Sequence, residues 1–188
     1  MKKIFTAVMV VFCMSFILSG CGGSKKVIFD DFGGRMSVTD VRAIMGEPDE
    51  VINEYKDPTE DSVLSNGLIS GDIDEIYHDV DLFGYKGSVE FRYGYEDGLF
   101  SISDSKSGKY SDDDTWLIYA YWTLESGRGF TEKEYNDISK KLTKKYGDPS
   151  IEQGSEELEN VWYDEKGNKY SFHKYESLQF DPNGKYPE

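Results

Sequence analysis

Apolar residues recur every three or four positions in two stretches of the chain, which is the spacing of an amphipathic helix. The first stretch begins at Ser37 or Thr39, either of which can cap a helix, and it stops at Gly46-Glu47-Pro48. The apolar side of this predicted helix consists of Val38, Val41, Ile44 and Met45. We therefore predict a short helix that ends before Gly46.

The second stretch begins with a capping box formed by Thr131 and Glu134. Four residues then follow at helical spacing: Tyr135, Ile138, Leu142 and Tyr146. The stretch stops at Gly147-Asp148-Pro149, which repeats the Gly-acid-Pro order of the first helix. Glycine permits a left-handed C-terminal cap and proline cannot continue a helix, so both ends have the same physical explanation.

Strand-like runs of apolar and β-branched residues follow each predicted helix. After the first helix they cover residues 51–56, 73–80, 88–93, 99–104 and 115–124; after the second they cover residues 158–163, 169–175 and 178–180. Turn signals lie at Tyr95-Glu96-Asp97-Gly98 and at residues 164–168. We expect an α+β fold in which two unequal units, residues 27–125 and 126–188, each form a helix followed by an antiparallel meander and pack as one domain.

This order of elements resembles the beta-lactamase-inhibitor-protein-like fold, which small bacterial lipoproteins of envelope assembly share. The resemblance is carried by Ser37-Val38-Thr39-Asp40-Val41, leading to Met45-Gly46-Glu47-Pro48, and by a weaker echo over residues 131–149. Each half here has one clear helix where that fold has two. The resemblance implies protein binding by a curved sheet face and no catalysis, and no binding residue is carried over by a motif.

The first 20 residues have the pattern of a secretory signal peptide. Lys2-Lys3 precede an apolar run over residues 4–18, which is too short to remain as a membrane-spanning helix. The following Leu18-Ser19-Gly20-Cys21 resembles the bacterial lipobox. This resemblance implies that Cys21 receives a diacylglyceryl group, carries palmitate-like acyl chains and becomes the new N-terminus. The alternative is an ordinary secretory signal that ends near a cysteine.

Residues 21–26 would then form a lipidated tether. Gly22-Gly23-Ser24-Lys25-Lys26 is flexible in composition and short, so the folded part should lie close to the membrane. Several acyl chains, each worth about 0.8 kcal/mol per buried methylene, hold a protein firmly without spanning the bilayer. We expect a cell-membrane lipoprotein on the extracytoplasmic face, with membrane lipid as its first partner.

Charge and cysteine content exclude several classes of function. Loss of residues 1–20 removes two lysines and no acidic residue, so 19 basic and 36 acidic side chains give the mature chain a formal charge of −17. Such a charge repels nucleic acid, so we expect no nucleic-acid partner. Cys13 leaves with the signal and Cys21 is acylated, which leaves no thiol for a disulfide, a metal or nucleophilic catalysis.

The strongest predicted strand covers residues 115–124 and is rich in aromatic side chains. Strict alternation places Trp116, Ile118, Ala120 and Trp122 on one face, and Leu117, Tyr119, Tyr121 and Thr123 on the other. Tyrosine combines a large contact area with a polar tip, so Leu117, Tyr119 and Tyr121 form a candidate partner-binding face. The simpler alternative is a central strand whose second face is covered by a loop or by the other unit.

Two charged groupings have plain explanations. The second helix carries lysines near its end, Lys140-Lys141 and Lys144-Lys145, and acidic residues near its start, Glu132 and Glu134. This is the order that a helix dipole favours; the alternative for the lysines is contact with lipid headgroups.

Acidic residues recur at Asp112-Asp113-Asp114, at Asp72, Asp74 and Glu75, and at Asp79 and Asp81. None of them has the spacing of an EF-hand loop, so we expect solvated acidic loops and no metal; the alternative is calcium bound by their carboxylate oxygens. We also expect no cofactor.

Catalytic motifs are absent from the sequence. The two histidines, His78 and His173, lack the His-Glu-x-x-His spacing of zinc proteases, and there is no Gly-x-Ser-x-Gly elbow or phosphate loop. We expect a non-enzymatic module that binds a protein or peptide of the cell envelope. The alternative is a hydrolase or metal-dependent enzyme that uses His78 or His173 with a nearby carboxylate such as Asp79. A solute-binding lipoprotein is disfavoured because such proteins need two larger lobes.

Overall fold

The computed structural model of the protein describes residues 25–26, 29–95, 100–101, 111–125, 128–153, 158–172 and 176–182. The predicted signal peptide, Cys21, His173 and most of the expected turn at residues 95–98 lie outside these ranges. The described part contains two α-helices and a large sheet, so the predicted α+β class is confirmed, with more strand than helix. Neither of these helices is both long and apolar enough to cross a membrane.

The elements divide into two groups, each led by an α-helix. The first group is β1 (Lys25–Lys26), η1 (Phe29–Asp31), α1 (Val38–Met45), β2 (Glu50–Asn53), β3 (Leu68–Ile69), β4 (Ile73–Leu82), β5 (Tyr85–Tyr95), β6 (Phe100–Ser101), η2 (Asp112–Asp114) and β7 (Thr115–Leu124). The second group is α3 (Glu132–Tyr146), β8 (Ser150–Gln153), β9 (Leu158–Tyr163), β10 (Lys169–Phe172) and β11 (Ser177–Asp181).

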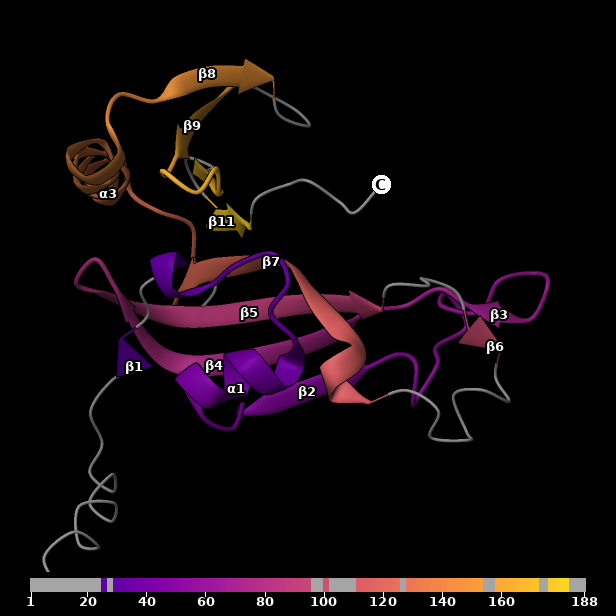
Figure 1. Ribbon diagram of the computed structural model, residues 1–188. Helices are drawn as coiled ribbons and strands as arrows, with labels where there is room; N and C mark the ends of the chain where they lie inside the picture. The colour runs from indigo at the N-terminus through magenta and orange to yellow at the C-terminus, as the bar shows by residue number, and fades with distance from the viewer. Residues whose placement is uncertain are drawn as a thin grey trace, which may run out of the picture.

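Nine of the described strands form one continuous sheet (Figure 1). Its order is β1-β4-β5-β7-β11-β10-β9-β8, and β2 lies beside β4 on the same side as β1. The last strands of the two groups, β7 and β11, pair antiparallel at the centre, and the earlier strands extend outward from them. Among the described pairs only β1 and β4 are parallel. The short strands β3 and β6 form a separate pair at one side of the molecule.

Capping residues fix both ends of α1 as expected. The Ser37 hydroxyl accepts from the Asp40 amide at 3.2 Å, and the Asp40 carboxylate accepts from the Ser37 amide at 2.9 Å. Gly46 ends the helix with φ of 78°. Val38, Val41 and Met45 are buried, but Ile44 is 47% exposed, so its expected place on the buried side is wrong. An eight-residue helix covers too narrow a stripe to bury all four apolar residues.

The helix α3 follows the prediction more closely. Its N-cap Thr131 and Glu134 form the predicted capping box, and Gly147 ends it with φ of 91°. Ile138 and Leu142 are buried against the sheet. Its two tyrosines stack on aromatic residues of β10: Tyr135 on Phe172 at 4.8 Å and Tyr146 on Tyr170 at 4.5 Å between ring centroids.

A single hydrophobic core joins the two groups of elements. Phe29 of η1 stacks on Phe180 of β11 at 5.1 Å, while Phe32 contacts Phe91 of β5 at 4.9 Å. The neighbouring Asp30 pairs with Lys145 at 2.6 Å and accepts hydrogen bonds from Tyr146 and Tyr170. Residues 29–32 therefore connect the N-terminal strands to α3 and to the C-terminal strands.

Several strand predictions differ from the structure at short or edge elements. Residues 25–26, expected in the tether, form β1 beside β4, and β3 and β8 were not predicted. The runs at residues 51–56, 99–104 and 169–175 are strands only over Glu50–Asn53, Phe100–Ser101 and Lys169–Phe172 in the described part. The turn at residues 164–168 is confirmed, since the Asp164 carboxylate accepts from the amides of Lys166 and Asn168.

Candidate functional site

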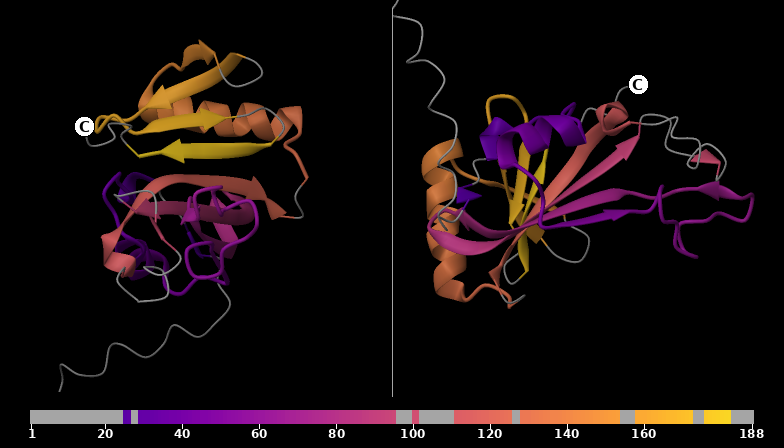
Figure 2. Two further views of the ribbon diagram at one scale, coloured as in Figure 1. Left: turned by 90° about the vertical axis from the view of Figure 1, so that its right-hand side faces the viewer. Right: turned by 90° about the horizontal axis from the view of Figure 1, so that it is seen from below.

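Both α-helices cover the same face of the sheet. The buried apolar residues of β4, β5, β7, β10 and β11 point toward α1 and α3, and the residues that alternate with them point the other way. Figure 2 shows α3 lying against β9, β10 and β11 on one side only. We call the sheet face opposite the helices the open face.

A row of cross-strand neighbours crosses the centre of the open face. Ile76 pairs with Glu90, Glu90 with Tyr121, and Tyr121 with Gln179, which in turn pairs with Ser171. The first four of these residues are half-buried, while Ser171 is only 3% exposed. The row therefore combines apolar, acidic, aromatic and amide groups on adjacent strands, which suits recognition of a mixed protein surface better than packing against another core.

Arg92 lies at the centre of the charged part of this face. Its Nε donates to Asp74 Oδ1 at 2.6 Å, and its Nη2 donates to Asp74 Oδ2 at 3.2 Å and to Glu90 Oε1 at 3.1 Å. Burial lowers the pKa of Arg92, but the hydrogen bonds and charge of Asp74 outweigh this effect and raise it above its usual value. The guanidinium is therefore permanently charged and held in one orientation by a bidentate carboxylate.

Two tyrosines of β7 extend this arrangement. The Tyr119 and Tyr121 rings lie 4.6 Å apart at an angle of 54°, and the Arg92 guanidinium lies 5.2 Å from the centre of the Tyr119 ring. Both tyrosines are half-buried, and this burial raises the pKa of each phenol. They remain neutral at physiological pH. We call Arg92, Tyr119 and Tyr121 the tyrosine-arginine cluster.

The surroundings of the tyrosine-arginine cluster are acidic. Asp72 Oδ2 lies 3.7 Å from Arg92 Nε, so Asp72, Asp74 and Glu90 surround one cation. Burial raises the pKa of Asp72, and burial together with the charge of Asp74 raises that of Glu90, in both cases against the opposing effect of Arg92. Excess negative charge beside half-buried phenol groups favours a ligand that brings positive charge and hydrogen-bond acceptors.

Leu117 does not belong to the predicted binding face. It is 2% exposed and lies in the core, whereas Tyr119 and Tyr121 lie on the open face. The reason is a bulge in β7: Arg92 pairs with Tyr119 and Tyr93 pairs with Leu117, so Ile118 is an extra residue. A bulge reverses the alternation, which strict sequence counting cannot anticipate.

The same bulge moves Trp116 and Ile118 away from the core side where alternation placed them. Both are half-buried and lie across Gly94 of β5, whose added Cβ would be 3.0 Å from Ile118 Cδ1 and 3.2 Å from Trp116 Nε1. Glycine thus lets these two side chains pack over the strand. They add apolar surface to the open face beside the tyrosine-arginine cluster.

His78 lies at the edge of the open face with its side chain 49% exposed. Its Nδ1 lies 2.9 Å from Ser88 Oγ and its Nε2 lies 3.0 Å from Glu50 Oε1. Asp79, the carboxylate proposed to assist it, pairs instead with Lys86 at 3.8 Å. The other candidate, His173, lies outside the described residues. In the described ranges no three His, Cys, Asp or Glu side chains gather as they would around a metal ion.

The acidic runs named from the sequence separate in space. Asp112 of the triple-aspartate run pairs with Arg42 at 3.2 Å, and Glu75 is fully buried with Arg42 Nη2 at 2.5 Å. The hydroxyls of Tyr77 and Tyr93 both donate to Glu75 Oε2 at 3.2 Å. This group of charges holds α1 and η2 on the sheet and is structural.

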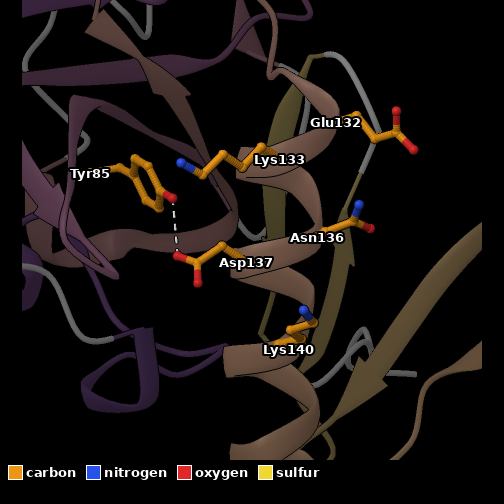
Figure 3. Close-up of a pocket in the computed structure, with 6 residues that line it drawn as sticks. All are labelled: Tyr85, Glu132, Lys133, Asn136, Asp137 and Lys140. Carbon is orange, nitrogen blue, oxygen red and sulfur yellow. Dashed lines mark hydrogen bonds between the residues drawn. The ribbon is translucent and has the colours of Figure 1, made fainter.

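A surface pocket lies on the outer side of α3 (Figure 3). It is lined by Tyr85, Glu132, Lys133, Asn136, Asp137 and Lys140. The Tyr85 hydroxyl donates to Asp137 Oδ2 at 3.0 Å, which ties the start of β5 to the helix. Five of the lining residues belong to α3 and Tyr85 begins β5, so no residue of the tyrosine-arginine cluster lines this pocket.

No protein family, curated protein or solved structure matches this chain. Sequence reasoning identified Tyr119 and Tyr121, named Asp74 only as a member of an acidic group, and missed Arg92 and Glu90. Alternation in β5 offered a signal, since Ser88, Glu90 and Arg92 occupy every second position and are all polar.

Proposed function

We propose that this chain is a membrane-anchored extracytoplasmic lipoprotein that binds a protein or peptide of the bacterial envelope and carries out no catalysis. Its fold is proposed to consist of two unequal helix-plus-meander units, joined through β7 and β11. The partner surface is the open face around the tyrosine-arginine cluster, and the lipid anchor is Cys21.

One observation carries the binding proposal. An Arg92 side chain fixed by Asp74, together with two neutral tyrosines, lies on a sheet face that neither α-helix covers. Tyrosine and arginine are the residue types that most often dominate interface energetics. Their prior hydrogen bonds reduce the conformational entropy that a partner must remove on binding. The acidic surroundings favour a partner with basic groups.

The anchor predicts a change of location for Cys21→Ala. Without the thiol no diacylglyceryl group can be attached, so the variant should leave the membrane fraction and fail to incorporate labelled fatty acid. Each lost methylene removes about 0.8 kcal/mol of membrane affinity, so we expect nearly complete release. Fractionation of cells after metabolic labelling with palmitate measures both effects. A Cys21→Ala chain that stays in the membrane pellet would refute the anchor.

The binding face predicts that Tyr119→Ala and Tyr121→Ala each lose a partner. Whole cells would be chemically crosslinked, the lipoprotein purified, and the attached proteins quantified. Loss of one interface tyrosine should lower the yield of the crosslinked partner about tenfold, which corresponds to about 1.4 kcal/mol of binding free energy.

Ile44→Ala is the matched control for this experiment. Ile44 is 47% exposed on α1, on the side of the sheet opposite the open face, so this variant should keep the wild-type yield. Thermal unfolding of each variant checks that the fold is retained. A partner captured equally by all variants, or no partner at all, would count against the open face as the binding surface.

The alternative function is a hydrolase that uses His78. The observation that favours it is the line of Ser88, His78 and Glu50, joined by contacts of 2.9 and 3.0 Å. In a serine hydrolase the serine faces Nε2 and the acid faces Nδ1, and here the two are reversed. Labelling of the protein by a fluorophosphonate probe, lost in Ser88→Ala, would establish the hydrolase in place of the binding module.

A further inference from the structure

We propose that the outer side of α3 rests on an anionic lipid surface through Lys133, Lys140 and Lys144. This inference goes beyond the binding function but depends on the proposed anchor at Cys21. Its role is to orient the tethered domain, since a mature chain with 19 basic and 36 acidic side chains, a formal charge of −17, needs a face that an anionic membrane does not repel.

The length of the tether places one end of the sheet near the membrane. Cys21 precedes Lys25 by four residues, and four residues span at most about 14 Å when fully extended. Lys25 and Lys26 form β1 and pair with Val80 and Asp81 near the end of β4. Whatever path residues 21–24 follow, this end of β4 stays close to the acylated residue.

The helix α3 is attached to the same end of the sheet. Lys141 Nζ donates to the carbonyl of Phe83 at 2.7 Å, in the turn between β4 and β5. The Tyr85 hydroxyl donates to Asp137 at 3.0 Å one helical turn earlier. Figure 1 shows β1 and α3 on the same side of the molecule, with β3 and β6 on the opposite side. A membrane close to β1 is therefore close to α3.

The charged residues of α3 fall into two sets: some form ion pairs that hold the fold together, and others are exposed on the outer side of the helix. Lys141 pairs with Asp137, Lys145 with Asp30, and Glu134 with Arg128. Lys133, Lys140 and Lys144 are exposed, and none of them forms an ion pair with a described carboxylate. Their spacing of seven and four residues places them along one side of the helix. We call these three lysines the lysine stripe. Glu132 is the exposed acidic residue next to them in the surface pocket, so the net charge of this side of the helix remains positive.

The dipole of α3 accounts for lysines at its C-terminal end, but it does not account for the lysine stripe, because Lys133 lies in the first turn of the helix. Anionic headgroups supply the complementary charge at the distance that the tether allows. Because α3 lies on one side of β9, β10 and β11, contact through its outer side turns the open face of these strands away from the bilayer. The proposed binding surface would then face a partner instead of the lipid.

Site-directed spin labelling of the full lipidated chain tests this orientation. The mature chain contains no free thiol once Cys21 is acylated, so Asn136→Cys on exposed α3 and Ser65→Cys near β3 each give a single labelling site. The labelled proteins are inserted into phosphatidylcholine vesicles with or without phosphatidylglycerol. We expect phosphatidylglycerol to lower the accessibility of position 136 to a water-soluble nickel relaxant at least about twofold, and to leave position 65 unchanged.

Two double variants, each of which removes two positive charges, distinguish an effect of the lysine stripe from an effect of the net charge of the protein. Lys140→Gln/Lys144→Gln should abolish the protection of position 136, whereas Arg35→Gln/Lys56→Gln, on exposed residues outside α3, should preserve it. High salt should also abolish the protection of position 136, because screening shortens the range of the attraction between the lysines and the anionic headgroups. Equal accessibility in both vesicle types, with protein that floats with the vesicles, refutes the lysine contact alone. Protein that does not float with either vesicle refutes the anchor, and the orientation with it.

Discussion

Gly87→Ala is expected to destabilise the protein by about 3 kcal/mol or more, because the new methyl group has no space. A Cβ built at Gly87 would lie 2.0 Å from the carbonyl oxygen of Thr123 and 2.8 Å from the indole ring of Trp122. Neither neighbour is free to move: Thr123 belongs to the paired strand β7 and Trp122 is fully buried. The substitution must therefore separate β5 from β7 near the centre of the sheet.

Gly33→Ala is the control for this effect. No atom lies within 4 Å of a Cβ built at Gly33, and its backbone does not have positive φ. Alanine there should change stability by less than about 1 kcal/mol, in the stabilising direction, because it restricts the unfolded chain. Urea or thermal unfolding followed by tryptophan fluorescence measures both variants, with a fall of about 6–12 °C expected for Gly87→Ala. Equal melting temperatures would contradict the close approach of the two strands.

Arg42→Ala is expected to cost about 3–5 kcal/mol at neutral pH, since it leaves a buried carboxylate without its counter-charge. Glu75 is fully buried and receives two short contacts from Arg42, from Nε at 2.6 Å and Nη2 at 2.5 Å. The remaining hydrogen bonds from Tyr77 and Tyr93 are neutral and cannot replace a guanidinium. Because α1 carries Arg42, its packing against the sheet should weaken as well.

The cost of Arg42→Ala should depend on pH through the ionisation of Glu75. Burial raises the pKa of Glu75 in the folded protein, and Arg42 and the tyrosine hydroxyls lower it only in part. A carboxyl group with a raised folded pKa favours folding at low pH and loses this advantage as pH rises above its ordinary range. Without Arg42 the pKa rises further, so the destabilisation relative to wild type should shrink as the pH is lowered from neutral.

Glu75→Gln in the Arg42→Ala background supplies the matched control. This double variant has no buried charge, so its stability relative to wild type should exceed that of Arg42→Ala at neutral pH and should vary less with pH. Urea unfolding at several pH values measures all three proteins. A destabilisation of Arg42→Ala that stays constant between acidic and neutral pH would show that Glu75 is not the group responsible.

Local signals in the sequence were sufficient for the helices and the long strands. Thr131 and Glu134 cap α3 because the capping box depends only on residues three apart, and glycine ends both helices for a reason equally local. The strand Thr115–Leu124 was predicted with its observed bounds because its aromatic and β-branched residues favour pleated backbone over a long run. The two-residue strand β1 forms by pairing with β4, more than fifty residues further along the chain, which local composition does not encode. The four-residue edge strand β8 pairs with the next strand, β9, and is too short to show a clear alternation of apolar and polar residues.

The candidate site was predicted only in part, for the same physical reason. Tyr119 and Tyr121 were identified from alternation, but Leu117 was assigned to the wrong face because Ile118 forms a bulge opposite β5. Arg92 acquires its role from Asp74, a residue of the neighbouring strand at 2.6 Å. Such a contact depends on strand register, which the sequence of one strand alone does not determine.

A photo-crosslinking amino acid placed at position 121 of the lipoprotein in living cells tests the central claim most directly, because it reports contact at the open face itself. The matched position is 44 on α1, which is exposed on the opposite side of the sheet. The proposed function predicts a specific crosslinked protein from position 121 that is absent from position 44 and is reduced by Arg92→Ala. The same products from both positions, or none from position 121, would contradict a binding surface at the tyrosine-arginine cluster.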